Sequence, residues 1–409
     1  MITLPPLGSL LLPLSLLLQP TLSDYTTTNN TTPKDNSQNC SCYVISSGAD
    51  SNTPEYFQYY RFFDFRNLAD HAGQFTQSPP FVNDTQDAGA EPVWDTKILN
   101  SPAWNVDWGI QNWSKPATSD FPVAMTNSPA NVYILQDNST QNPLTYLTLR
   151  TSRLESFQSA AEIENEQKNV LHCSMRMYAR VLGSAGAVAG FFTFFDDTNE
   201  TDIEILTDDP TDMVRYTNQP AVDKQGNEVQ AASKNPDKLA PWDQWQTHRI
   251  DWFEKNSYWF LNGKQVAANT YSVPRKPSGV VINMWSDGGE WSGNMSVGDS
   301  AEFQIQWIEL VFNTSGPVGG PGGGNKKREA VALDLEGGTE IKAVDDGMGK
   351  GMYEWKRKAK GCEVVCKVDG VKEIGTPEVV SVNKSAAAGM SVSWGLLVVV
   401  GVVSILVGM

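Results

Sequence analysis

The 409-residue chain is poor in several kinds of residue, and each shortage narrows the range of functions. Lys and Arg number 31 against 47 Asp and Glu, so the formal net charge is −16. Nucleic-acid-binding surfaces need an excess of basic side chains, which excludes nucleic acid as a partner. Only three histidines occur. Apart from His172, which stands beside Cys173, no histidine lies at ligand spacing from a cysteine. The sequence therefore does not predict a zinc site, and we expect no bound metal.

Long runs of helical period are also missing, whereas patterns typical of strands are frequent. Apolar and polar residues alternate over 132–136, 144–153 and 173–181, and 186–195 is a continuous apolar run. The pair Asn262-Gly263 is typical of a tight hairpin turn. The pattern predicts an all-β fold, a jelly-roll sandwich of two packed antiparallel sheets.

Both ends of the chain carry apolar segments that are too short for an ordinary membrane-spanning helix. At the start, an apolar run is followed by small residues up to Ser23, so residues 1–23 are predicted to be a secretory signal peptide. The alternative is an apolar element of the mature fold. At the end, small residues from 385 precede an apolar tail to 409, which predicts a glycolipid-anchor (GPI) signal. The alternative is a retained membrane tail.

These signals predict an extracellular protein attached to the plasma membrane or cell wall through a C-terminal anchor. Potential N-glycosylation sequons agree with secretion, among them Asn29, Asn83, Asn112, Asn138, Asn294 and Asn313. Between the two ends, we expect a flexible lead-in over 24–39 and one folded domain over 40–315. A Gly-rich hinge and a stalk without a core of its own follow over 316–384.

The five cysteines would pair in an oxidising compartment. The expected pairs are Cys40 or Cys42 with Cys173, and Cys362 with Cys366, which leaves one thiol over. A small module stapled around Cys362 and Cys366 is the alternative to an unfolded stalk.

The stretch NETDIEIL, residues 199–206, places acidic residues at every second position. In a strand, Glu200, Asp202 and Glu204 share one face, and the alternate residues face the core. Aligned like charges raise at least one pKa, so that a proton donor can stand beside an ionised nucleophile. The alternative is an acidic, solvated strand face.

The spacing of the two outer acids suits cleavage of a glycosidic bond. Four strand steps of about 3.3 Å put the Cα atoms of Glu200 and Glu204 roughly 13 Å apart. If both side chains lean inward, their carboxyl groups lie about 5 Å apart, which is the separation of a retaining glycosidase.

At these residues the chain resembles glycoside hydrolase family 16, the laminarinase and lichenase group. The stretch ETDIE matches the Glu-x-Asp-x-Glu signature, in the branch without an inserted bulge residue. The similarity extends to SMRMYARVLGSAGAVAGFFTFF, QTHRIDWFEKNSYWFLNGKQV and VPRKPSGVVINMWSDGG, and most resembles secreted, anchored fungal members. It implies a concanavalin A-like jelly roll with a sugar cleft. It also implies Glu200 as nucleophile, Glu204 as general acid/base and Asp202 as the assisting carboxyl.

A glucan cleft needs flat apolar platforms and hydrogen bonds at its rim. We expect Trp285 as the main platform, because Asn283 and Asp287 share its strand face, and Trp291 as a second. Further substrate-binding candidates are Tyr216, Asn218, His248 and Asn283. For these the alternatives are a polar turn (Tyr216 and Asn218) and a core histidine (His248). Trp104, Trp108 and Trp113 either pack a long loop or line the entrance of the cleft.

The sequence therefore predicts an extracellular, retaining glycosidase, an endo-β-glucanase that cleaves β-1,3- or mixed-linkage β-1,3/1,4-glucan. We expect it to act as a monomer without an essential cofactor, although the resemblance allows a structural calcium ion. The alternatives are a transglycosylase of the same family, a non-catalytic glucan-binding lectin, and a tethered adhesion or structural protein.

Overall fold

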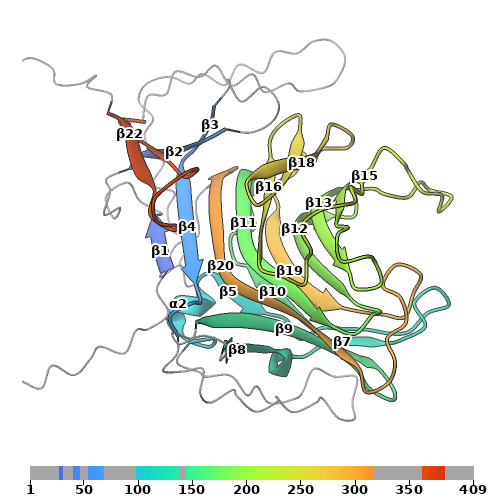
Figure 1. Cartoon of the computed structure of the whole chain (residues 1–409). Coiled ribbons are helices and arrows are strands. Elements are labelled where there is room, and N and C mark those ends of the chain that lie inside the picture. Colours follow the sequence, from blue (N-terminus) through green and yellow to red (C-terminus); the bar gives the residue numbers. More distant parts are fainter. Residues whose placement is uncertain are drawn as a thin grey trace, which may run out of the picture.

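The computed structural model describes residues 27–30, 40–46, 54–68, 98–137, 144–316 and 362–382. Nearly all regular structure in these residues is β-strand, apart from the short helix α2 (Pro102–Asn105) and the 3-10 turn η1 (Pro129–Asn131). The strands curl into two facing layers (Figure 1), which confirms the predicted all-β sandwich. None of the helical segments described is long and apolar enough to cross a membrane.

One layer, the front sheet, carries the acidic stretch. Its strands in spatial order are β5 (Trp108–Ile110), β10 (Gln158–Asn165), β19 (Gly279–Trp285), β12 (Val188–Asp196), β13 (Asn199–Leu206), β14 (Arg215–Asn218) and β15 (Ser233–Lys234). Every neighbouring pair in this order is antiparallel. The strand with the three acids is therefore flanked on both sides, which fixes the directions of its side chains.

The other layer, the back sheet, contains in order β1 (Thr27–Asn30), β4 (Tyr59–Asp64), β20 (Ser300–Thr314), β11 (Val170–Gly183), β16 (Gln246–Trp252), β17 (Ser257–Leu261) and β18 (Lys264–Asn269). The strands that connect the two layers are β6 (Ser114–Lys115), β7 (Met125–Asn127), β8 (Val132–Gln136) and β9 (Thr145–Arg153). Strand β9 pairs with both β20 and β10, so the two sheets are continuous along one side.

A third, small sheet covers the outer face of the back sheet, and we call it the clasp sheet. It consists of β3 (Glu55–Phe57), β2 (Cys42–Ile45), β21 (Val364–Lys367) and β22 (Glu378–Val382). Strands β2 and β21 come from opposite ends of the chain and pair in parallel. Its buried residues Tyr43, Phe57 and Cys366 pack with Tyr60 and Trp307 of the back sheet in a second hydrophobic core.

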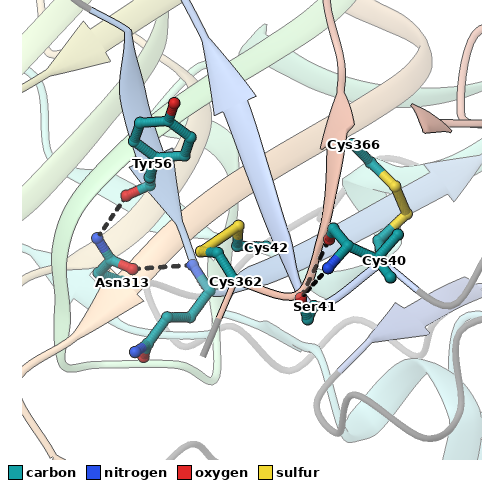
Figure 2. The surroundings of a disulfide bond; sticks show 9 residues. Cys40, Ser41, Cys42, Tyr56, Asn313, Cys362 and Cys366 are labelled. Carbon is teal, nitrogen blue, oxygen red and sulfur yellow. Dashed lines mark hydrogen bonds between the residues drawn. A yellow bond between two sulfur atoms is a disulfide. The ribbon is translucent and has the colours of Figure 1, made fainter. Parts of the chain in front are cut away.

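The clasp sheet corrects two predictions. Disulfides join Cys40 to Cys366 and Cys42 to Cys362 (Figure 2), and Cys173 is a buried free thiol. The predicted pairs were wrong because Cys173 points into the main core, whereas the other four cysteines meet where β2 and β21 lie side by side. The prediction of a stalk without a core is also wrong for residues 362–382, which fold against the body.

The N-terminal lead-in differs in part from its prediction as well, because residues 27–30 form β1 and pair with β4. The predicted signal peptide, the Gly-rich hinge from 317 and the anchor signal from 385 lie outside the described residues.

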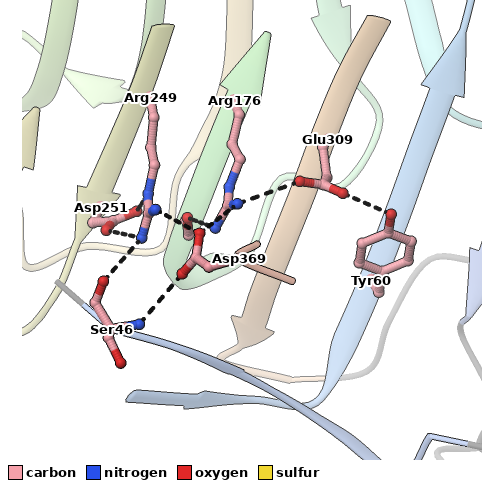
Figure 3. Close-up of polar contacts among 8 residues, drawn as sticks. Ser46, Tyr60, Arg176, Arg249, Asp251, Glu309 and Asp369 are labelled. Carbon is pink, nitrogen blue, oxygen red and sulfur yellow. Dashed lines mark hydrogen bonds and ion pairs between the residues drawn. The ribbon is translucent and has the colours of Figure 1, made fainter. Parts of the chain in front are cut away.

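Beneath the clasp sheet, charged side chains of the back sheet form a paired network (Figure 3). Arg176 Nη1 lies 2.9 Å from Asp369 Oδ1, and Arg249 Nη1 lies 2.8 Å from the same oxygen. Arg249 also binds Asp251 through Nε at 2.7 Å, and Tyr60 donates a hydrogen bond of 2.7 Å to Glu309. Asp369 belongs to the C-terminal part of the clasp, so this network joins the clasp to the body.

Candidate active site

Strand β13 presents its three acids on one face, as the spacing predicts. Glu200, Asp202 and Glu204 pair in regular register with Phe194, Phe192 and Gly190 of β12. The alternate residues Thr201, Ile203 and Ile205 are at most 3% exposed and face the core. Residues directly opposite one another in a sheet share a face, so the partners of the three acids on β12 lie on the same side as the acids. We call this side of the front sheet the acidic face.

Burial shapes the protonation of the three acids. It raises the pKa of Glu200 to about 8, that of Glu204 to about 7 and that of Asp202 well above its ordinary value. The negative charges of Glu200 and Glu204 raise the pKa of Asp202 further, whereas its hydrogen bond with Glu200 lowers the pKa of Glu200. The three groups therefore share protons near neutral pH instead of carrying three charges.

Asp202 is only 1% exposed and is held in place by the residue that follows β14. Gln219 Nε2 donates to Asp202 Oδ2 at 3.2 Å, and Gln219 Oε1 accepts a hydrogen bond from the Ala221 backbone N–H at 2.7 Å. The second contact fixes which end of the amide faces Asp202. Gln219 is thus a supporting residue that the sequence alone did not single out.

Glu204 is held by one of the predicted tryptophans. Trp291 Nε1 donates to Glu204 Oε1 at 3.1 Å, and this hydrogen bond lowers the pKa of Glu204 against the effect of burial. Trp291 remains 38% exposed. Part of its ring surface is therefore available to a ligand that lies over the acids.

A cavity of about 160 Å³ opens on the acidic face over β19 and β10, and its lining does not include the three acids. Its lining residues are Trp113, Lys115, Met125, Asn127, Glu162, Asn283 and Trp285. Two of these, Trp285 and Asn283, were predicted from the sequence. Of the three tryptophans with two possible places, Trp113 lines the cavity, whereas Trp104 and Trp108 are fully buried in the core. The cavity thus combines aromatic surface with polar groups.

The register connects this cavity to Glu204 in a single row across the sheet. Glu204 is opposite Gly190, Gly190 is opposite Asn283, and Asn283 is opposite Glu162. With neighbouring strands about 4.8 Å apart, Glu162 lies roughly 14 Å from Glu204. A Cβ at Gly190 would stand only 2.5 Å from Asn283 Oδ1, so the glycine makes room for that amide.

Glu162 is a fourth acid of this face and was missed by the sequence analysis. It accepts hydrogen bonds from Trp113 Nε1 at 2.9 Å and from Asn283 Nδ2 at 3.3 Å. Burial raises its pKa, and both hydrogen bonds oppose that rise. The alternation along β10 could have identified Glu162. Its neighbours Ala161 and Ile163 face the core, so Glu162 must point to the opposite face of the strand.

Three predicted substrate-binding residues are not brought to the site. Tyr216 and Asn218 are 0% exposed and lie on the core side of β14, opposite Ile203 and Thr201 of β13. His248 is 1% exposed and lies in the back sheet, where burial lowers its pKa to about 4. For His248 the alternative of a core histidine describes the structure better, whereas Tyr216 and Asn218 belong neither to the cleft nor to the polar turn that was their alternative.

The parity of β14 explains the error. The stretch RYTN is a strand, not a loop, and its acidic-face residues are Arg215 and Thr217. Asp287 also differs from expectation: it lies beyond the end of β19, is 1% exposed, and accepts hydrogen bonds from Gly289 N–H at 3.1 Å and from Ser292 Oγ at 3.0 Å. It shapes the loop that carries Trp291.

Across the residues that the structure describes, no group of three or more metal-ligating side chains is placed to hold an ion. A proton donor and a carboxylate held over one strand can act on a bond that lies between them.

Comparisons with known proteins bear on the same region. Residues 124–309 match the family model described as "Glycosyl hydrolases family 16". A "Beta-glucanase" of Bacillus licheniformis is 25% identical over 137 residues, which cover 31% of this chain and 53% of that protein. A "Beta-glucanase" of Bacillus subtilis (strain 168) matches at the same identity and coverage. The chain thus spans about half the length of the curated relatives it matches.

Solved structures give similar neighbours. The Bacillus licheniformis beta-glucanase structure has 18% identity and a TM-score of 0.39, and the alignment covers 50% of this chain and 92% of that one. The laminarinase catalytic domain from Thermotoga maritima MSB8 has 13% identity and a TM-score of 0.38, over 51% of this chain and 92% of that one. The family match thus covers residues 124–309, which is less than half of the chain, and over that stretch the chain is similar to glycosyl hydrolase family 16.

Proposed function

We propose that this protein is a retaining glycosidase that cleaves internal β-glucosidic bonds of β-1,3- or mixed-linkage β-1,3/1,4-glucan. The observation that carries the proposal is the row of Glu200, Asp202 and Glu204 on one face of β13, with the Trp-lined cavity on the same face of the sheet. The family match and the two bacterial β-glucanases support the same substrate class.

The proposed roles follow from the charge distribution that the reaction needs. The reaction needs a proton on Glu204 and a negative charge on Glu200, which is the reverse of the order of their pKa values, about 7 and about 8. A proton held on Asp202 favours the required distribution, because Asp202 can then donate a hydrogen bond to the Glu200 carboxylate, and this hydrogen bond lowers the pKa of Glu200. Glu204 gives its proton to the glycosidic oxygen as the bond to C1 breaks, and a Glu200 oxygen attacks C1 to form a glycosyl ester. Water then attacks C1 and loses its proton to Glu204. This attack breaks the ester bond between C1 and Glu200 and releases Glu200 as a carboxylate.

The regular pairing of β13 supports the double displacement. No register shift interrupts Glu200 to Glu204, so the estimate of about 5 Å between inward-leaning carboxyl groups applies to this strand. An inverting mechanism needs a wider gap that holds a water molecule.

Stereochemistry and chemical rescue test the proposal. NMR of the first product from a mixed-linkage glucan should show the β-anomer, and an α-anomer first would exclude the retaining route. Glu200→Gly should lose hydrolysis and, with azide, form an α-glycosyl azide, whereas Glu204→Gly should form the β-azide. Glu254→Gln, an exposed change in the β16–β17 turn, is the control. Binding without any bond cleavage by the wild type would indicate a lectin instead.

A sugar hydroxyl can replace water in the second step, which would make the protein a transglycosylase. Product lengths from a defined oligosaccharide distinguish the two outcomes, because only transfer yields products longer than the substrate.

We also propose that the protein works outside the cell, attached to membrane or wall by its C-terminal segment. The two disulfides support an oxidising compartment. Release of the protein from intact cells by a phosphatidylinositol-specific phospholipase would support a glycolipid anchor, and retention after that treatment would favour a membrane tail.

A further inference from the structure

Arg215 is the charged neighbour of Glu204 on the acidic face, and its surroundings hold it rigidly. It lies directly opposite Glu204 in the β13–β14 pair. Its Nε and Nη2 each lie 2.8 Å from an oxygen of Asp209. A guanidinium bound through two nitrogens to one carboxylate has a fixed plane as well as a fixed position.

The plane of Arg215 is also set by an aromatic ring. Its guanidinium carbon lies 4.7 Å from the centre of the Trp291 ring. Trp291 in turn donates its only N–H to Glu204 Oε1. Asp209, Arg215, Trp291 and Glu204 therefore form a continuous chain of contacts that ends on the proposed acid/base.

The backbone brings together the two segments that carry this series of contacts. Gly293, two residues after Trp291, has a φ of +77°, and a Cβ there would overlap the Asp208 carboxylate. The loop that carries Trp291 can thus close onto the turn that carries Asp209. Gly293 N–H also donates to Gly289 O at 3.0 Å, which tightens the loop.

These contacts distinguish the two oxygens of Glu204. An indole N–H donates and cannot accept, so the oxygen it binds must act as an acceptor. Oε1 is therefore occupied as an acceptor, and the acidic proton belongs on Oε2. The cation of Arg215 stabilises the carboxylate that Glu204 becomes after it has donated that proton.

We propose that Asp209, Arg215 and Trp291 form a positioning unit that directs the catalytic proton of Glu204 to Oε2 and stabilises the carboxylate left after proton transfer. The proton passes from Oε2 to the leaving glycosidic oxygen, while the C1–oxygen bond breaks and a C1–Glu200 bond forms. This inference rests on the proposed function and assigns to Arg215 a role that acts through Glu204.

Other groups near Glu204 affect its charge and that of Arg215. Glu200 and Asp202 on its own strand are acidic, and β12 contributes the uncharged Gly190 opposite it. Asp209 and Glu228 raise the pKa of Arg215, so its charge persists at every relevant pH. Arg215 lowers the pKa of Glu204, and its loss should therefore raise that pKa.

The test compares two leaving groups in a matched series of variants. An oligoglucoside of dinitrophenol needs no proton for its leaving group, whereas glucan does. Arg215→Met and Trp291→Phe should each lower kcat on glucan about 10-fold and leave formation of the glycosyl-enzyme from the dinitrophenyl substrate nearly unchanged. For Arg215→Met, the basic limb of the kcat/KM profile on glucan should move up by about one pH unit. Arg215→Lys, which keeps the charge, should leave that limb in place.

Each outcome has a distinct meaning. If Arg215→Met slows both substrates equally and leaves the pH profile unchanged, Arg215 is merely structural and the inference is wrong. If the wild type cleaves neither substrate, the proposed function itself fails. Circular dichroism and the thermal midpoint of each variant establish that the compared proteins are folded.

Discussion

Among the described residues, two groups of buried and half-buried carboxylates differ in what surrounds them. Under the clasp sheet, Asp369 and Asp251 contact Arg176 and Arg249 at 2.9 Å or less (Figure 3). Burial favours the neutral form of Asp369, but the two arginines outweigh it and hold its pKa below the ordinary value. On the acidic face, the three acids of β13 lie beside one another, and burial raises the pKa of each.

The contrast indicates that the two groups serve different ends. Buried charges that meet opposite charges are compatible with a stable fold, although such pairs contribute little net stability. Aligned acids with raised pKa values cost stability and are typical of sites that transfer protons. Changes to the acidic face should therefore affect activity, and changes under the clasp should affect stability.

The largest effect should follow from Glu200→Gln. Without the proposed nucleophile the glycosyl ester cannot form, so kcat on β-glucan should fall about 10,000-fold. The thermal midpoint at pH 8 should stay equal or rise, because one buried acid has been neutralised. A variant with wild-type kcat, or with the same loss of activity only because it unfolds, would contradict the proposed division between the two groups.

Removing both disulfides should have the next largest effect, since they hold the clasp over the paired network. The first cross-link closes a loop of 326 or 320 residues, whereas the second then closes only residues 40–42 and 362–366. Loss of either disulfide alone leaves the long loop closed by the other and should cost about 2 kcal/mol of unfolding free energy. Loss of both also frees the long loop and should cost more than the sum of the two single losses, that is, more than about 4 kcal/mol.

Urea unfolding of the two single-pair Cys→Ser variants and of the four-Cys variant measures this difference. The kcat of the folded four-Cys variant should match that of the wild type, because the clasp lies on the other side of the sandwich from the three acids. A cost for the four-Cys variant that equals the sum of the two single-pair costs would show that the disulfides close independent loops and would contradict this argument.

Breaking the paired network itself should cost slightly less. Arg176→Met leaves Glu309, which is 1% exposed, without its cation, and burial already raises the pKa of Glu309. The unfolding free energy should fall by about 3 kcal/mol. The double variant Arg176→Met/Glu309→Gln should regain part of the loss, because it removes the unpaired charge as well.

Lys255→Met, in an exposed turn of the same sheet, is the control for loss of one positive charge. If Arg176→Met were no less stable than this control, the network would not hold the clasp.

The free energy of unfolding should depend on pH in opposite directions for the two groups. A raised pKa on the acidic face makes the protein less stable as pH rises, and a lowered pKa in the paired network makes it less stable as pH falls. Asp202 has a raised pKa in the folded protein, so the folded state binds protons more tightly than the unfolded chain does. Its contribution is fully present at low pH and is lost as pH rises toward the folded pKa. Asp202→Asn should therefore be more stable than the wild type by about 1 kcal/mol at pH 8, and the difference should vanish near pH 4. A wild type that gains stability from pH 5 to 8 relative to Asp202→Asn would contradict the raised pKa.

The same contrast shows what the sequence could and could not predict. Period-two spacing was enough to place Glu200, Asp202 and Glu204 on one face, because side-chain direction in a strand is set locally. The prediction that Tyr216 and Asn218 bind substrate was wrong because the parity of their segment was not counted, and that parity places both residues on the core side. Cysteine pairing and the paired network depend on contacts between residues more than 100 positions apart, and no local pattern encodes these.

The smallest effect should come from the far end of the row that links Glu204 to the cavity. Trp113→Phe keeps an aromatic surface and removes the N–H that binds Glu162 at 2.9 Å. Without this hydrogen bond the ring and the Glu162 carboxyl are less firmly positioned in the cavity. KM for long glucans should therefore rise, by up to about fivefold if the whole contribution of about 1 kcal/mol is lost from binding. Because Glu162 lies roughly 14 Å from Glu204, kcat should not change. Trp291→Phe makes the matched comparison, since it removes an N–H bound to the proposed acid itself and should lower kcat instead. If Trp113→Phe lowered kcat and left KM unchanged, the cavity would act on the chemical step rather than on binding.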